Sequence, residues 1–261
     1  MSENSPNLTP LSELFRSPSD PASVNDGLGE LPEWDLADLY AAMDAPELEA
    51  DLQKAADDSV AFEKRWKGGL ETAAHTDGDE GLGTALRQFE ALEELMGRIV
   101  SYAGLTYFSD TTDPARAKFY GDIQTKITDV GSRLLFFPLE LNRIEDGVID
   151  AAMENDPAAA HYSPWLIDLR KDKPYQLEDR IEKLFHEKSV TGHGAWNRLF
   201  DETMAALRFT IDGEVLTLEP TLNKLQSPDG DERRTAAKAL SKTFEENIRT
   251  FTLITNTLAK E

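Results

Sequence analysis

Apolar residues recur every three or four positions over most of the chain, which is the spacing of one face of an α-helix. The first such stretch begins with Pro46 in its first turn, has Asp44 available as a cap, and ends at Gly68-Gly69. Its apolar positions are Leu48, Leu52, Ala55, Ala56, Val60 and Trp66. This pattern predicts a chain built mainly of helices.

Two longer apolar stripes predict a helical hairpin. The first stripe consists of Phe89, Leu92, Met96, Ile99, Ala103 and Tyr107. The second consists of Phe119, Ile123, Ile127, Val130, Leu134 and Leu135. Between them, Asp113 and Pro114 supply a cap and a first-turn proline. Because the connection is short, we expect two antiparallel helices whose stripes face each other, and we assign the stripes to the core in preference to a peptide groove.

Prolines divide the next part of the chain into shorter helices. We expect one helix over residues 142–153, ended by Asp156-Pro157, and another that begins at Ser163-Pro164. The second should bury Trp165, Leu166 and Leu169.

The segment 175–207 is amphipathic and is interrupted by glycines. Its first half has one apolar face, formed by Leu177, Ile181, Leu184 and Phe185, and one charged face. Its second half continues the pattern with Trp196, Leu199, Phe200, Met204 and Leu207. We expect two helices joined by a connector over residues 191–194.

The period then changes from helical to alternating. Apolar residues flank Asp212-Gly213, a dipeptide typical of tight hairpins, and predict two short strands. After Ser227-Pro228, a last apolar face runs to Leu258 without a glycine or proline stop, which predicts one helix in which the chain ends. The fold class is therefore predicted as all-α, a multi-helix lobe with a long antiparallel helical hairpin and one small β-hairpin near residues 208–219.

The beginning of the chain has a different composition. Residues 1–29 are rich in proline, serine and asparagine, and we expect a disordered tail. They contain neither a basic region nor an apolar run, so a secretory signal or membrane anchor is not expected. An apolar cluster follows in residues 31–40, where Trp34 is expected to be a packing anchor.

The composition limits the partners and the compartment. Among 261 residues, 27 are Lys or Arg and 49 are Asp or Glu, a formal net charge of −22. This balance opposes binding to nucleic acid and to anionic membranes. The chain has no cysteine, which excludes disulfides and thiol catalysis and fits a reducing compartment, so we expect a cytoplasmic protein.

One candidate metal site lacks its second histidine ligand. His186-Glu187 opens like the His-Glu-x-x-His helix of zinc peptidases, but Val190 occupies the position of the second histidine. His193 lies further on, and a helix would separate the two histidines by ~10 Å, at a rise of ~1.5 Å per residue, too far for one zinc with bonds of ~2 Å without unusually convergent side chains. We therefore interpret His186 as a residue of the polar helix face, and assign no catalytic, cofactor-binding or metal-ligating residue.

Several segments resemble a known family. The segments are LPEWDLADLY at residues 31–40, RKDKPYQLEDRIEKLF and SVTGHGAWNRLFDET within residues 170–203, and LNKLQSPDGDERRTAAKALSKTFEENIRTF at residues 222–251. They are similar to the N-terminal half of oligoendopeptidase F, a zinc oligopeptidase related to thimet oligopeptidase. The resemblance covers nearly everything after about residue 30. It implies a helical lobe over residues 30–206 and, over residues 207–261, the start of a catalytic domain that stops before the zinc motif.

The resemblance implies a metalloendopeptidase that hydrolyses short peptides. The lobe would shape the substrate channel and limit access by size, with zinc and its ligands in the catalytic domain, so the 261-residue chain alone is expected to be inactive. One alternative is a non-enzymatic, acidic helical module for protein interaction. A further alternative is a zinc site formed by His186, Glu187 and His193 themselves.

Overall fold

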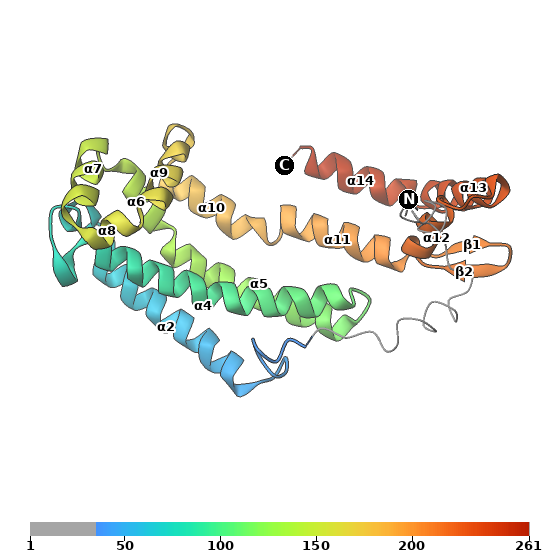
Figure 1. The fold of residues 1–261 in the computed structure, drawn as a ribbon, viewed down its shortest axis with the longest axis horizontal. Helices are drawn as coiled ribbons and strands as arrows, with labels where there is room; N and C mark the ends of the chain where they lie inside the picture. Colours follow the sequence, from blue (N-terminus) through green and yellow to red (C-terminus); the bar gives the residue numbers. More distant parts are fainter. Residues whose placement is uncertain (1–34, 261) are drawn as a thin grey trace, which may run out of the picture. The chain divides into compact units, whose positions relative to one another are not determined.

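The computed structural model describes residues 35–260 and consists almost entirely of helices (Figure 1). In chain order the elements are α2 (Pro46–Trp66), α3 (Leu70–Ala73), η1 (Gly78–Glu80), α4 (Leu82–Ser109), α5 (Pro114–Leu134), α6 (Phe136–Arg143), α7 (Asp146–Asn155), α8 (Pro157–His161), α9 (Ser163–Leu169), η2 (Arg170–Tyr175), α10 (Asp179–Ser189), α11 (His193–Ala206), β1 (Phe209–Ile211), β2 (Glu214–Leu216), α12 (Leu218–Lys224), α13 (Gly230–Glu246) and α14 (Ile248–Leu258). The predicted all-α fold with one β-hairpin is confirmed. The predicted tail at residues 1–29 and the anchor Trp34 lie outside the described residues.

The described chain forms two compact units. Of the described residues, the larger contains 36–207 together with 246–260, and the smaller contains 208–245 together with Asp35. The proposed division into a lobe at 30–206 and the start of a catalytic domain at 207–261 stays a prediction.

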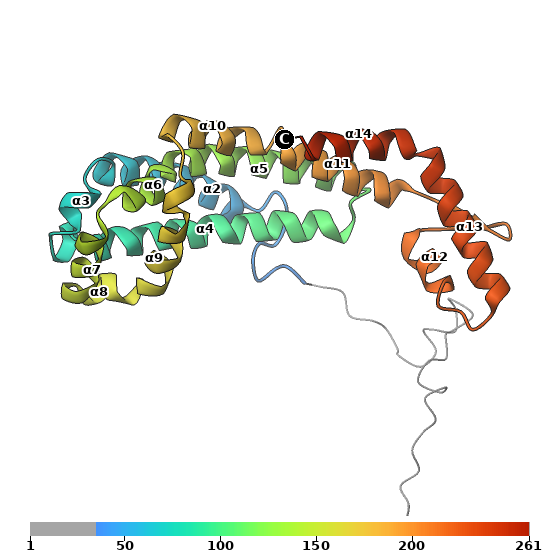
Figure 2. The ribbon, with the colours of Figure 1, turned by 90° about the horizontal axis from the view of Figure 1, so that it is seen from above.

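The larger unit is organised around the antiparallel hairpin of α4 and α5, as predicted, with α2 alongside (Figures 1 and 2). Its turn is set by Asp113, whose carboxylate accepts a hydrogen bond from the N–H of Ala115 (2.8 Å). Near that turn the rings of Tyr107 and Tyr120 stack at 4.9 Å. Ile99 and Ala103 of α4 share a buried cluster with Ile123 of α5, so the two apolar stripes face each other across the hairpin.

Two details of α2 differ from the sequence prediction. Its N-cap is Ala45, whose side chain can accept no hydrogen bond, and not Asp44. Val60 is 48% exposed, whereas Phe62 is buried in its place. A helical stripe tolerates a shift of this kind because neighbouring positions on the wheel differ by only a fraction of a turn.

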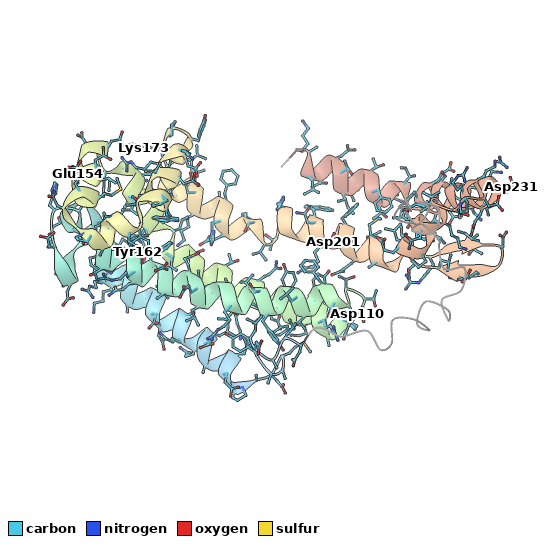
Figure 3. All side chains as sticks on the ribbon, in the orientation of Figure 1. Asp110, Glu154, Tyr162, Lys173, Asp201 and Asp231 are labelled. Carbon is cyan, nitrogen blue, oxygen red and sulfur yellow. The ribbon has the colours of Figure 1, made fainter. Side chains whose placement is uncertain are left out.

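Helices α6 to α9 gather at the end of the hairpin opposite its turn (Figure 1). Phe137 is fully buried there, with the rings of Phe62, Phe89 and Trp165 around it. Tyr162, labelled in Figure 3, donates a hydrogen bond to Glu90 of α4 (2.5 Å). The aromatic packing of this end holds the segment that leads into α10.

The helix predicted over residues 142–153 is displaced. Asn142 belongs to α6, and α7 begins at Asp146. As predicted, Asp156-Pro157 ends it, and a short helix, α8, follows at once. Trp165 was expected on the buried side of α9 and is instead 37% exposed, while Leu166 is buried.

The smaller unit contains the predicted β-hairpin. Phe209 pairs with Leu216, and the turn at Asp212-Gly213 has positive φ at both residues, 50° and 89°. The short helix α12 that follows was not predicted. Phe209 is fully buried and meets the ring of Phe244 of α13 at 5.9 Å.

The prediction of a single last helix is wrong. It is divided at Asn247, where φ and ψ are −105° and 7°, so that α14 is a separate helix. This break lets α14 return to the larger unit, where Phe251 contacts Phe200 of α11 at 5.9 Å. None of the described helices is both long and apolar enough to cross a lipid bilayer.

Candidate functional site

Helix α10 packs on α5, and α11 follows α10 in the chain (Figure 1). One polar side chain from each helix approaches α5, His186 from α10 and Arg198 from α11. The Nε2 atom of His186 lies 3.3 Å from the carbonyl oxygen of Thr128. Next to it, a Cβ added at Gly131 would lie 2.9 Å from the same nitrogen. On α11, Arg198 approaches Gly121 in the same way, at 3.2 Å from an added Cβ. The two glycines of α5 thus make room for polar side chains.

The apolar face of α10, formed by Leu177 just before the helix together with Ile181, Leu184 and Phe185, points the opposite way. These four side chains are 48%, 39%, 53% and 59% exposed, and α10 contains no buried residue. An apolar face of an amphipathic helix normally packs on the core, because its burial stabilises the fold. On α10 this arrangement is reversed, which makes the apolar face the most distinctive surface of the segment.

The side chains of the incomplete zinc motif, His186, Glu187 and His193, do not point to a common centre. His186 faces α5, whereas Glu187 lies near Lys183 on the exposed side (3.6 Å). His193 is exposed in the first turn of α11, and its ring contacts the side chain of Asn197 (3.0 Å). These residues do not fit a shared zinc ion. Throughout residues 35–260, no group of three or more His, Asp or Glu side chains is arranged to hold a metal ion.

His186 lies on the polar helix face, as predicted, but that face is turned toward α5. The predicted connector at residues 191–194 is shorter than expected, since α11 begins at His193 with Gly192 as its N-cap.

A groove of about 720 Å³ lies between α2 and α4 in the same unit. Its lining combines apolar residues such as Phe62 and Leu92 with acidic and basic residues. The charged side chains pair with one another: Lys54 with Asp58 within α2, and Arg98 of α4 with Asp51 of α2. This groove therefore offers few unpaired charges to a ligand.

Tyr40 closes one end of this charged network. Its hydroxyl donates to Asp51 (2.7 Å) and accepts from Nε of Arg98 (3.1 Å). Burial, followed by the neighbouring Asp51 carboxylate, raises the pKa of Tyr40 to about 12. The hydroxyl therefore stays protonated at neutral pH and fastens the chain before α2 to both helices.

A second buried tyrosine lies where α11 crosses the hairpin. Tyr107 is 1% exposed, and burial, followed by the charges of Glu202 and Asp201, raises its pKa to about 12. Asp201 is labelled in Figure 3. Because the phenol stays protonated at neutral pH, it is a packing group of this interface and not a general base.

Sequence reasoning missed two features of these sites. It did not find the hydrogen bonds of Tyr40, although the residue ends the resembling segment at 31–40. It also did not predict that the apolar face of α10 points away from α5, because helical spacing defines an apolar face without saying what lies against it.

Comparison with known proteins bears on the segment that contains α10 and α11. Residues 140–209 match a family model described as Oligopeptidase F. The oligoendopeptidase-F of Enterococcus faecium has a similar fold, with a TM-score of 0.70 and 20% identity over 82% of this chain and 42% of that chain. A protein solved as a candidate peptidase from Chlamydophila abortus aligns with a TM-score of 0.47 and 19% identity over 86% of this chain and 38% of its own. No curated protein sequence matches the chain.

The predicted resemblance to an N-terminal portion of an oligoendopeptidase F-like peptidase is thereby confirmed. The matched segment begins in α6 and ends in β1, and so includes α10 and α11. The chain spans less than half the length of the two solved proteins that it matches.

Proposed function

We propose that this chain is the N-terminal lobe of a zinc-dependent oligoendopeptidase that hydrolyses short peptides. The observation that carries the proposal is the family match over residues 140–209, which agrees with the resemblance found from the sequence. The similar fold of the Enterococcus faecium oligoendopeptidase-F supports it, since the alignment covers 82% of this chain.

The lobe would act by shape and not by chemistry. In the complete enzyme it would form part of the wall of the substrate channel, and its bulk would keep folded proteins away from the reacting groups. His186, Glu187 and His193 do not fit a zinc ion, so the metal would be held by residues outside this chain. Alone, the 261-residue chain would be inactive.

The charge of the chain fits a peptide substrate, and its lack of cysteine fits the proposed cytoplasmic location. A net charge of −22 opposes association with nucleic acid and anionic lipid, both of which are also negative. It favours the approach of basic peptides. The second partner would be the catalytic domain of the same polypeptide.

The proposal is tested by comparing two proteins from one gene, the 261-residue chain and the longest product that contains it. Each is incubated with a short internally quenched peptide, with and without a zinc chelator. We expect that only the longer protein cleaves the peptide. This cleavage should stop when the chelator is added and resume when zinc is restored. A folded protein substrate should resist cleavage, because the channel excludes it.

A different class of function has one observation in its favour. The exposed apolar face of α10 is also what a free-standing interaction module would present to a partner. If neither protein cleaves the peptide under any metal condition, the peptidase proposal fails and the interaction module is preferred.

A further inference from the structure

The apolar face of α10 needs a cover that residues 35–260 do not provide. Leu184 is 53% and Phe185 59% exposed, whereas full burial of one such side chain stabilises a protein by ~1.5–3 kcal/mol. Meanwhile the polar side of the helix is held in place, since Arg143 of α6 forms an ion pair with Asp179 (2.9 Å) and His186 contacts α5. The helix is therefore fixed with its apolar face outward.

The neighbouring helix shows what such a cover looks like. Like α10, α11 places a polar residue, Arg198, against α5, and its outward side carries Phe200. That side is partly covered by α14, whose Phe251 meets the ring of Phe200 at 5.9 Å, and Phe200 remains 41% exposed. The described chain thus covers α11 in part, whereas Leu184 and Phe185 of α10 are more exposed, at 53% and 59%.

Followed toward its C-terminal end, the axis of α14 leads from α11 toward α10. It runs antiparallel to α11, and its end lies beside the junction between α10 and α11 in both views (Figures 1 and 2). Asn256, Thr257 and Lys260 line a hollow together with Trp196 of the first turns of α11. A helix prolonged in this direction by about eleven residues would extend ~16 Å, which matches the length of α10 at the same rise per residue.

The charges beside the apolar face indicate the composition of the cover. Arg180 precedes Ile181, and Lys188 lies one helical turn after Leu184. Within residues 35–260 the side chains of Arg180 and Lys188 form no ion pair, in a chain whose net charge is −22. An occupant with acidic residues beside its apolar stripe would complement both.

We propose that, in the full-length peptidase, the segment immediately after Glu261 continues α14 as a helix and packs an apolar stripe with acidic borders on Leu177, Ile181, Leu184 and Phe185. This inference rests on the proposed function, because it requires that the polypeptide continue into the remainder of the enzyme. It adds to that function the surface by which the lobe holds the next segment.

The test is photo-crosslinking in the full-length protein. The present sequence contains no cysteine, so Leu184→Cys provides a single attachment point for a benzophenone maleimide once any later cysteines are changed to serine. Within the 261-residue chain Leu184 is 53% exposed, so the substitution should leave the folding of the lobe itself unchanged. Val60→Cys on α2, where the side chain is 48% exposed, is the matched control. After irradiation, the crosslinked peptides are identified by mass spectrometry.

We expect the label at position 184 to attach to one of the first ~15 residues after Glu261, a length set by the helical rise, and the label at position 60 not to attach there. Attachment to a distant part of the chain, to a second copy or to no peptide at all would overturn the inference. Peptide cleavage by the same preparation is recorded separately. Cleavage without the expected crosslink would reject only the packing, whereas the crosslink without cleavage would reject only the peptidase function.

Discussion

The carboxylate of Asp156 accepts a hydrogen bond from the backbone N–H of Gly83, at 3.1 Å and across 73 positions of the sequence. Its other oxygen accepts from the N–H of Ala158 at 2.8 Å. One side chain thus serves the first turns of two helices, α4 and α8, whose first N–H groups have no partner within the helix itself. This contact joins the start of the long hairpin to the group of short helices at its end.

Replacing the carboxylate of Asp156 should therefore lower the free energy of unfolding more than removing a cap that serves one helix. We expect Asp156→Ala to lower the free energy of unfolding by ~2 kcal/mol, because two backbone donors lose their acceptor. Asp113→Ala is the control, since Asp113 accepts from one N–H at the start of α5, and its loss should cost ~1 kcal/mol. Urea unfolding followed by circular dichroism measures both. Equal effects would show that the bond to Gly83 contributes nothing.

Gly83 itself is required for the same contact. A Cβ at this position would lie 2.5 Å from the Cβ of Ala158 and 2.5 Å from Oδ2 of Asp156. We expect Gly83→Ala to destabilise the chain by ~1–3 kcal/mol, the usual cost of overpacking, despite the better helix propensity of alanine. Gly97→Ala on the same helix meets nothing within 4 Å and should stabilise by ~0.5–1 kcal/mol. Thermal or urea unfolding should show that Gly83→Ala lowers the stability and Gly97→Ala raises it.

Arg170 closes the end of α6 with a single side chain that is 14% exposed. It donates to the carbonyl oxygens of Leu141 (2.9 Å) and Ile144 (2.7 Å) and to the carboxylate of Asp146 (3.1 Å). We expect Arg170→Ala to cost ~2–3 kcal/mol, because buried carbonyl groups lose their donor, and Arg170→Lys to recover only part of it. The adjacent Lys171 is 70% exposed, so Lys171→Ala should change the stability by less than ~0.5 kcal/mol. Similar losses at both positions in urea unfolding would contradict the role of Arg170.

These contacts show why the sequence predicted the elements better than their packing. Asp113-Pro114 and Asp212-Gly213 are local signals, because each acts on its own turn, and both predictions were confirmed. The bonds of Asp156 and Arg170 join positions far apart in the chain. No local pattern marks them, since an acidic or basic residue after a helix is common on any surface.

The errors have a similar origin. The break at Asn247 was missed because neither glycine nor proline accompanies it, and the division is set by the return of α14 to α11. For the candidate site, the sequence identified the residues but not the direction in which the apolar face of α10 points. Spacing identified Leu177 and the three apolar residues of α10, as well as the two candidate histidines, but only the structure shows that the polar side of α10 faces α5.

The network around Tyr40 makes a prediction about alkaline pH. The folded pKa of about 12 is above the ordinary value of 10.0, so ionisation is opposed in the folded state. The resulting stabilisation is fully present below pH 10 and is lost as the pH rises toward 12. At pH 8, Tyr40→Phe should cost ~1–2 kcal/mol, because Asp51 and Arg98 lose a partner, and the difference from the wild type should narrow above pH 10.

Urea unfolding at several pH values measures this difference. Tyr175→Phe is the control, since Tyr175 is 81% exposed and should leave the stability within ~0.5 kcal/mol at every pH. A gap between wild type and Tyr40→Phe that stays constant from pH 8 to about 12 would exclude the assigned shift.

Polar substitutions on α10 separate the stability of the lobe from its role in a larger protein. In the 261-residue chain, the double change Ile181→Gln and Leu184→Gln should alter the free energy of unfolding by less than ~1 kcal/mol, because both side chains are at least 39% exposed. By comparison, Leu166→Ala in α9 should cost ~2–5 kcal/mol, since Leu166 is 1% exposed. In the full-length protein the same double change should destabilise by ~3 kcal/mol or more, because two covered apolar contacts are lost. A full-length protein that tolerates the double change as well as the shorter chain does would mean that the apolar face of α10 stays open to solvent.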